Sequence, residues 1–279
     1  MPDNYVVGVD GSDHSKDALQ WAVNEAASCG ASVTAVLTWQ MPFDGSGFAP
    51  SGDIIDGFAG HQQGLLDEVV DRVDTKGLAE QIERVVVASG NPGHVLAERG
   101  HDADLLVVGT RGRGGFLGLL LGSVAEYCLH NATCPIALVP AGPLPISDET
   151  VVGVDGSPTS VDALRWAVER ARHTGGRVTA VYSWNWLDQP EGSEFDANFG
   201  EREALAHLEA VVTDAGLSDD RVGVEAINDL PARALIERAA KAKSVVVGSQ
   251  RQSAIKMVLV GSVARQLAHH TPIPLVVHR

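Results

Sequence analysis

Cysteine is scarce in this 279-residue chain, and long hydrophobic runs are missing from it. The three cysteines, Cys29, Cys128 and Cys134, are odd in number and lack metal-site spacing, so they predict free thiols in a reducing compartment. No apolar run approaches the roughly 18 residues that a membrane-spanning helix needs. The opening residues, Met1-Pro-Asp-Asn, lack the basic and apolar segments of a signal peptide. We therefore expect a cytoplasmic protein with no membrane-embedded part.

Positive charge is scarce as well. The chain has 21 Lys and Arg against 36 Asp and Glu, which gives a formal net charge of −15. General nucleic-acid binding depends on a basic surface, so this class of partner is not expected. The ten histidines include no His-x-x-x-His pair supported by a carboxylate, and we expect no metal site.

A glycine-rich segment stands out against this background. It follows the apolar run Leu105–Val108, precedes a helix-like stretch, Val124–His130, and reads Gly109-Thr-Arg-Gly112-Arg-Gly-Gly-Phe-Leu-Gly-Leu-Leu-Leu-Gly122-Ser123. Glycines let a backbone turn tightly and approach a ligand closely. A helix start offers free N–H groups and the positive end of the helix dipole. This strand, loop and helix start predict a phosphate cradle.

The segment matches neither of the two common phosphate loops. It contains no lysine, so it is not a P-loop, and Leu117 stands where the dinucleotide pattern G-x-G-x-x-G requires its third glycine. The spacing that remains is Gly109, two residues, Gly112, nine residues, Gly122 and Ser123.

The chain also contains an internal repeat. Tyr5-Val-Val-Gly-Val-Asp10-Gly-Ser recurs as Thr150-Val-Val-Gly-Val-Asp155-Gly-Ser, and 21 of the 34 positions in 6–39 are identical in 151–184. The loops correspond too, because Gly109, Gly122 and Ser123 match Gly248, Gly261 and Ser262. A period near 140 residues is too long for a solenoid. We predict two tandem domains, 1–140 and 150–279, joined by a proline-rich linker, 141–149.

Each copy alternates apolar strands with amphipathic helices, which predicts an α/β fold with a parallel, doubly wound sheet of five strands and helices on both faces. A glycine-rich loop is expected over Met41–Gly57, and Ser157-Pro158 predicts a helix start. The predicted strands are Val6–Val9, Val33–Trp39, Val85–Ala88, Leu105–Val108 and Ile136–Val139, then Val151–Val154, Val178–Ser183, Val222–Ile227, Ser244–Val247 and Ile273–Val277.

These motifs resemble the universal stress protein family over nearly the whole chain. The resemblance rests on Val-Gly-Val-Asp-Gly-Ser at the first strand, on the loop spacing, and on the ending Ala132-Thr-Cys-Pro-Ile-Ala-Leu-Val. It implies two Rossmann-like domains of the adenine nucleotide α-hydrolase type, with ATP, with or without Mg²⁺, bound at the carboxyl ends of the strands. That location agrees with the general rule for open α/β sheets. The resemblance also implies an internal pseudo-dimer, with or without further homodimerisation.

By this resemblance Asp10 lies near the adenosine, Thr38 meets adenine through its backbone, and Ser123 with the N–H of Val124 holds phosphate. The residues expected at nucleotide sites are Gly8, Asp10, Thr38, Gly109, Arg111, Gly112, Gly122, Ser123 and Val124 in the first copy, and Gly153, Asp155, Gly248, Gly261 and Ser262 in the second. No catalytic residue is expected.

Several of these residues also have a purely structural interpretation. Asp10 stands in Asp-Gly-Ser, a common turn sequence. Ser123 is followed three residues later by Glu126, the arrangement of a capping box. Trp39 and Trp184 end the second strands and either pack in the core or border adenine. In the second copy Arg251 replaces the second loop glycine, so we expect the first copy to be the better nucleotide site.

The function that follows from the resemblance is ATP-dependent regulation in stress or dormancy adaptation, by binding rather than by catalysis. Two alternatives stay open, a slow ATP hydrolase with Asp10 as base and a scaffold that binds no nucleotide. The hypothesis of regulation by nucleotide binding also allows cyclic AMP as the ligand in place of ATP.

Overall fold

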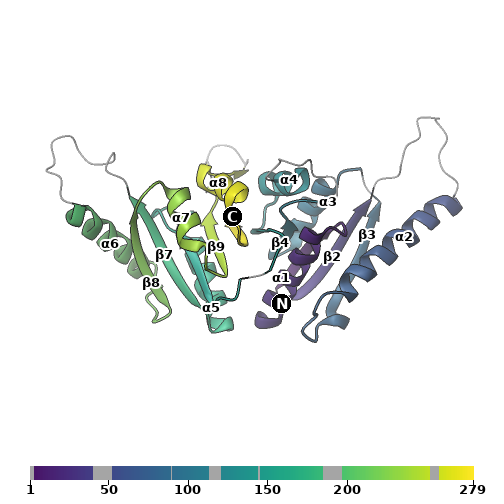
Figure 1. Cartoon of the computed structure of the whole chain (residues 1–279), viewed down its shortest axis with the longest axis horizontal. Helices are drawn as coiled ribbons and strands as arrows, with labels where there is room; N and C mark the ends of the chain where they lie inside the picture. Colours follow the sequence, from purple (N-terminus) through teal and green to yellow (C-terminus); the bar gives the residue numbers. More distant parts are fainter. Residues whose placement is uncertain are drawn as a thin grey trace. The chain divides into compact units, whose positions relative to one another are not determined.

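The computed structural model describes residues 3–39, 52–88, 90–112, 121–143, 145–184, 197–251 and 258–279. The chain divides into two compact units, Met1–Pro143 and Leu144–Arg279, and both alternate strands with helices (Figure 1). Within the described residues, no helix has the length and apolar character that crossing a membrane requires.

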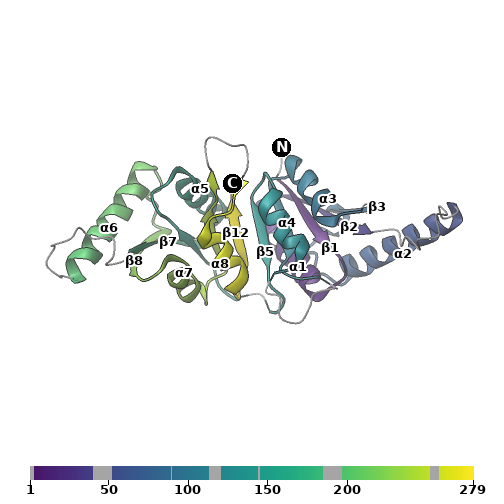
Figure 2. The same cartoon turned by 90° about the horizontal axis from the view of Figure 1, so that it is seen from above.

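The first unit is a parallel sheet in the order β3-β2-β1-β4-β5, with helices on both faces. Helices α1 and α2 contact each other on one face, and α3 packs against α4 on the other (Figure 2). Its elements are β1 (Asn4–Val9), α1 (Asp13–Cys29), β2 (Ser32–Trp39), α2 (Gly52–Asp71), β3 (Ile82–Ala88), α3 (Pro92–Arg99), β4 (Leu105–Gly109), α4 (Ser123–Asn131) and β5 (Ile136–Val139).

The second unit repeats this plan, with a parallel sheet in the order β8-β7-β6-β9-β12. It adds a short antiparallel pair, β10 with β11, after β9. Its elements are β6 (Glu149–Gly153), α5 (Pro158–Thr174), β7 (Arg177–Trp184), α6 (Ala197–Asp214), β8 (Val222–Asn228), α7 (Pro231–Ala239), β9 (Ser244–Gly248), β10 (Gln250–Arg251), β11 (Val258–Leu259), α8 (Ser262–His270) and β12 (Leu275–His278). The predicted α/β class with two tandem Rossmann-like domains is confirmed.

The central strands form because their apolar runs are covered on both faces, as parallel sheets require. All four residues of Leu105–Val108 are buried, and so are their counterparts Val245, Val246 and Val247. A glycine in β1 lets α3 approach the sheet, because a Cβ on Gly8 would lie 2.7 Å from Cδ1 of Leu96.

Side-chain caps fix where the first helix of each unit begins. In α5, Ser157 accepts a hydrogen bond from the N–H of Ser160 at 3.3 Å, and Pro158 occupies the first helical position. The helix start predicted at Ser157-Pro158 is therefore confirmed. Helix α5 ends at Gly175, whose φ of 73° is the left-handed conformation that glycine adopts without strain.

One secondary-structure prediction is wrong in part. The loop expected over Met41–Gly57 is already helical from Gly52, where α2 begins, and residues 40–51 lie outside the described residues. Glycine disfavours helix, but packing overrides propensity here. The ring of Phe58 in α2 stacks on Trp39 with centroids 6.1 Å apart and planes 18° apart.

Candidate functional site

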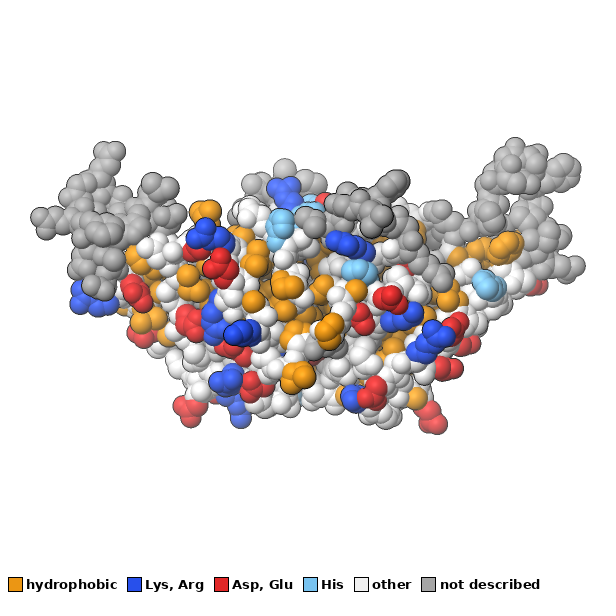
Figure 3. Space-filling model, in the orientation of Figure 1, with side chains coloured by type: hydrophobic (Ala, Val, Ile, Leu, Met, Phe, Trp, Pro, Cys, Tyr) orange, Lys and Arg blue, Asp and Glu red, His pale blue; other side chains and the backbone are white. Residues whose placement is uncertain are grey.

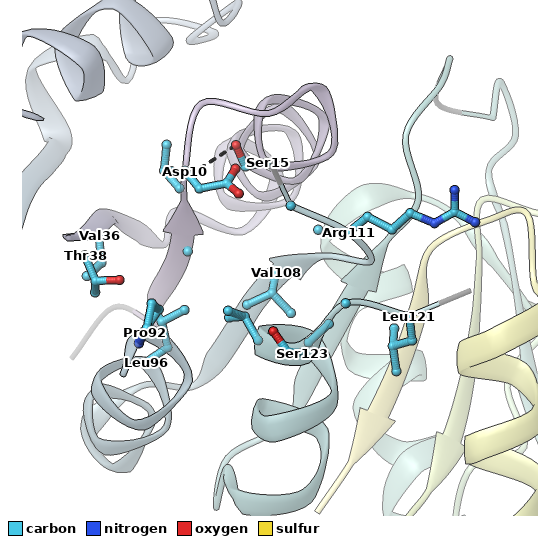
Figure 4. A pocket seen from close by; sticks show the side chains of 17 residues that line it. Asp10, Ser15, Val36, Thr38, Pro92, Leu96, Val108, Arg111, Leu121 and Ser123 are labelled. Atoms are coloured by element: carbon cyan, nitrogen blue, oxygen red, sulfur yellow. Dashed lines mark hydrogen bonds between the residues drawn. The ribbon is translucent and has the colours of Figure 1, made fainter. Parts of the chain in front are cut away.

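A cavity of about 490 Å³ lies at the carboxyl ends of the central strands of the first unit (Figure 4). This is where open α/β sheets bind ligands. Apolar side chains such as Val36, Leu96 and Val108 line its inner part. All nine site residues predicted in the first copy line the cavity: Gly8, Asp10, Thr38, Gly109, Arg111, Gly112, Gly122, Ser123 and Val124.

Asp10 is held at the edge of this cavity by the turn that leads into α1. Its Oδ1 accepts hydrogen bonds from the backbone N–H of Ser12 at 2.9 Å and from the Ser12 hydroxyl at 2.6 Å. Gly11 makes the turn possible with a φ of 80°. Ser12 also caps α1, since its Oγ accepts from the N–H of Ser15 at 3.2 Å. Asp10 therefore stabilises the turn, as its sequence context predicts, and the turn in return holds its carboxylate beside the cavity.

Two loop glycines are required by the protein's own packing. A Cβ on Gly112 would lie 2.5 Å from Oδ2 of Asp10, and a Cβ on Gly109 would lie 2.8 Å from backbone atoms of His14. Neither has a positive φ. Close approach of the loop to Asp10 and α1 therefore explains both glycines without a ligand.

Helix α4 begins at the cavity wall with a glycine at its N-cap. This residue, Gly122, has φ −80° and ψ 155° and carries no side chain that could cap the first amides. The capping box predicted for Ser123 and Glu126 is thus wrong. The chain places Gly122 at the cap because its N–H donates to the carbonyl of Thr110 at 2.7 Å, which ties the end of the loop to its beginning.

Consequently Ser123 is the first residue of the helix and is exposed. The residues of this first turn, Ser123, Val124 and Ala125, line the cavity. Free N–H groups at the positive end of a helix dipole favour an anion. The arrangement can therefore hold a negatively charged group.

The charges around the cavity are mixed. Its described lining contains one carboxylate, Asp10, and one cation, Arg111, whose side chain extends away from Asp10 (Figure 4). On the face shown in Figure 3, the described Lys and Arg side chains are interspersed with Asp and Glu and form no continuous basic patch.

A model of the universal stress protein family matches residues 1–140 and again residues 148–279. The chain belongs to the universal stress protein family.

Similar proteins extend over nearly the whole chain. A universal stress protein of Mycobacterium tuberculosis (strain H37Rv) is 31% identical over 288 residues, which cover 98% of this chain and 96% of that protein. The crystal structure of a universal stress protein from Archaeoglobus fulgidus matches the fold with a TM-score of 0.69 at 20% identity, covering 99% of this chain and 98% of that one. A universal stress protein crystallised in complex with cAMP is 28% identical, covers 50% of this chain and 98% of its own, and has a TM-score of 0.39.

The second universal stress protein unit has its own cavity, of about 560 Å³, at the equivalent strand ends. Three of the five residues predicted there, Gly153, Asp155 and Gly248, line it. The other two, Gly261 and Ser262, are described but are not part of its lining. The structure therefore gathers the predicted residues of the first copy completely and those of the second only in part.

Several lining residues were missed by sequence reasoning, although the repeat carried a signal for them. Ser15, Pro92 and Leu96 line the first cavity, and their counterparts Ser160, Pro231 and Leu235 line the second. Each is the same residue type in both copies.

Trp39 and Trp184, considered for the adenine pocket, line neither cavity. Trp39 stacks on Phe58, and the ring of Trp184 lies against Gly200.

No group of three or more His, Cys, Asp or Glu side chains able to hold a metal ion occurs among the residues described.

His14 lies beside the first cavity, with Nδ1 3.1 Å from Oγ1 of Thr110. Burial lowers the pKa of His14, and the nearby Arg111 lowers it further, against the opposing effect of Asp17, Asp10 and Asp13.

Proposed function

We propose that the first unit binds ATP, and that the protein acts as a nucleotide-dependent regulator in stress or dormancy adaptation. The observation that carries this proposal is the presence of Asp10 and the first turn of α4 in the wall of one cavity. A carboxylate at a strand end suits ribose hydroxyls, and uncapped helix amides suit phosphates. The apolar inner wall suits the base.

The shape of the site supports this ligand. A volume of about 490 Å³ falls within the range of roughly 300–1,000 Å³ that is typical of small-molecule sites. Because Gly112 has no side chain, the loop backbone lies directly against Asp10 at the edge of the cavity. Mg²⁺ would be carried by the phosphates together with water, since this ion commonly keeps several waters when it accompanies a nucleotide.

We infer binding rather than rapid turnover. Asp10 is the candidate base nearest the loop, and its Oδ1 is already engaged by two hydrogen bonds from Ser12. In the proposed site the rest of this carboxylate accepts from ribose hydroxyls, so it is not placed to take a proton from an attacking water, as a general base must. Steady phosphate release that Asp10→Asn abolishes would favour the slow hydrolase instead.

A proline substitution tests the helix amides directly. Ser123 is the first helical residue, where proline is well tolerated, and the ψ of 155° at Gly122 suits a residue that precedes proline. Ser123→Pro removes one amide donor without breaking the helix, and Ser123→Ala removes the hydroxyl alone. A hydrogen bond to a charged group contributes about 1.5–3 kcal/mol, so calorimetry should find ATP binding weakened by about ten- to a hundredfold in Ser123→Pro.

The second unit provides a matched control. Ser262 begins α8 after Gly261, with the same ψ of 155°, but neither residue lines the second cavity. Ser262→Pro should leave ATP affinity unchanged. An equal loss in both proline variants would contradict the proposed site. Absence of binding by both ATP and cyclic AMP in the parent protein would favour the scaffold.

A further inference from the structure

The cavity of the second unit differs from the first in the elements that enclose it. Its lining takes Ser157, Thr159 and Asp162 from the start of α5, whereas Gly261 and Ser262 at the start of α8 do not contribute. In the first cavity the start of α4 contributes three residues of its first turn. Of the first turn of α8 only Val263 lines the second cavity, so the helix start has a smaller share of this wall than of the first.

The two loops differ in residue type at the position where the first loop contacts Asp10. Gly112 fits against Asp10 because it has no Cβ, and Arg251 holds the equivalent position in the second unit. A Cβ at position 251 would overlap the carboxylate of Asp155 if the second loop followed the path of the first. Instead Gln250 and Arg251 form β10, which pairs antiparallel with β11.

The charge of the cavity also opposes a phosphate. Among its described lining residues are two carboxylates, Asp155 and Asp162, and no Lys or Arg. Asp162 is paired with Arg165 at 2.8 Å, while Asp155 forms no ion pair with the described residues. Burial raises the pKa of Asp155, but hydrogen bonds from Ser157 and Ser160 outweigh this effect and lower it overall. Asp155 is thus an ionised acceptor at neutral pH.

A buried hydroxyl in the same wall lacks a partner. Ser249 lines the cavity, is 0% exposed, and its Oγ forms no hydrogen bond in the described part of the chain. In the first unit the equivalent Thr110 lies 3.1 Å from Nδ1 of His14. Thr159 stands where His14 would be, and its Oγ1 lies 3.3 Å from the Ser157 hydroxyl. A buried polar group without a partner is destabilising unless a ligand satisfies it.

We propose that the second cavity binds an uncharged nucleoside rather than a nucleoside polyphosphate. The carboxylate of Asp155 accepts hydrogen bonds from ribose hydroxyls, as acidic residues at strand ends commonly do. The nucleoside also supplies a hydrogen-bond partner for the buried Ser249 hydroxyl. Val181 and Leu235 supply the apolar surface for the base. This site lies in the second unit, and its ligand does not depend on what the first cavity binds.

The test is a calorimetric titration of the full chain with adenosine, in saturating ATP–Mg²⁺ to occupy the first cavity. One equivalent of adenosine is expected to bind. Asp155→Asn should weaken it by about tenfold or more, because the charged acceptor is lost. A second equivalent of ATP that disappears in Asp155→Asn would overturn the proposal. So would the absence of any adenosine binding that responds to Asp155→Asn.

Ser249→Ala adds a readout that separates ligand binding from a structural role. It should weaken adenosine by about three- to tenfold and raise the unfolding temperature of the ligand-free chain, because it removes an unsatisfied hydroxyl. A lowered unfolding temperature with unchanged adenosine affinity would show that Ser249 serves the fold alone and would contradict the proposal. The adenosine titration is repeated without ATP, so a failure of ATP to bind the first unit leaves this test intact.

Discussion

Nδ1 of His14 accepts a hydrogen bond from the backbone N–H of Ala141, 3.0 Å away and 127 residues later in the chain. A backbone N–H can only donate, so this nitrogen must be unprotonated. The same segment is tied a second time, because the N–H of Gly142 donates to Oδ2 of Asp17 at 2.8 Å. The start of α1 thus holds both the loop residue Thr110 and the end of the first unit.

This bond predicts a pH-dependent stability of the first unit. Burial and Arg111 lower the pKa of His14 below its ordinary value of 6.5, so the unfolded chain takes up the proton first as the pH falls. The stabilisation is complete above pH 6.5 and is lost progressively below it. Urea unfolding between pH 7.5 and pH 5 should show this loss, and NMR titration should place the His14 pKa below 6.5.

His14→Thr is the matched variant, since Thr159 occupies this position in the second unit. It should cost about 1–2 kcal/mol at pH 7.5 for the lost hydrogen bonds, and it should flatten the pH dependence. A His14 that titrates at or above 6.5, or an unchanged slope in the variant, would refute this prediction.

Alanine at either of two equivalent loop glycines should destabilise the protein without any ligand. A Cβ on Gly109 would lie 2.8 Å from the His14 backbone, and one on Gly248 would lie 2.6 Å from the Thr159 backbone. Overpacking of this kind costs about 1–3 kcal/mol. Thermal unfolding of ligand-free Gly109→Ala and Gly248→Ala should show both losses. Gly57→Ala is the control, because open space surrounds its Cβ position. It lies within α2, so it should stabilise slightly.

A half-buried ion cluster should contribute to the stability of the second unit. Arg238 donates to Glu149 at 2.7 Å and to Glu225 at 2.9 Å, and its hydrogen bond to Glu149 lowers the pKa of that carboxyl group. Arg238→Met leaves two close carboxylates without their cation and should cost about 1–3 kcal/mol at pH 7. Because the pKa of Glu149 is lowered, this contribution is present above its ordinary value of 4.5 and shrinks as the pH falls below it.

The exposed pair of Arg165 with Asp162 is the control for that measurement, with side chains 44% and 53% exposed. Arg165→Met should change the free energy of urea unfolding by less than about 0.5 kcal/mol. Equal effects of the two substitutions at pH 7 would show that the Arg238 cluster contributes nothing beyond a surface pair.

The cysteines should differ widely in reactivity. Burial, together with the neighbouring Cys134, raises the pKa of Cys128 to about 12, while Cys29 is only partly buried and lies 3.2 Å from the Tyr5 hydroxyl. The thiolate is the reactive form. A thiol reagent at pH 8 should therefore modify Cys29 in the native protein and reach Cys128 only after unfolding. Mass spectrometry of the labelled chain would contradict this if Cys128 reacted first.

Local patterns in the sequence were enough to predict the sheet and the first cavity. Strands such as Leu105–Val108 are continuous apolar runs, and Asp10 with the loop glycines recurs in the repeat. Both features can be recognised from a few residues that are neighbours in the sequence. The start of α2 at Gly52 was missed because a contact between Phe58 and Trp39 outweighs the glycines, and that contact depends on the folded sheet.

The details of the loops could not be predicted for a related reason. The capping box expected at Ser123 failed because a bond between Gly122 and Thr110, twelve residues apart, sets the cap. The contact of His14 with Ala141 and the pairing of β10 with β11 are likewise tertiary. Arg251 did signal a departure in the second copy, but the displacement of Gly261 and Ser262 from the cavity needed the structure.

The bond between Gly122 and Thr110 also bears on how such a duplicated gene can evolve. It joins the residue that follows β4 to the residue that precedes α4, so both ends of the loop are held together. No such bond joins Gly261 to Ser249 in the described second unit, yet all five strands of its sheet are present. The fold therefore tolerates loss of the closure. The segment between β9 and α8 can therefore change in sequence while the five strands of the second unit stay in place.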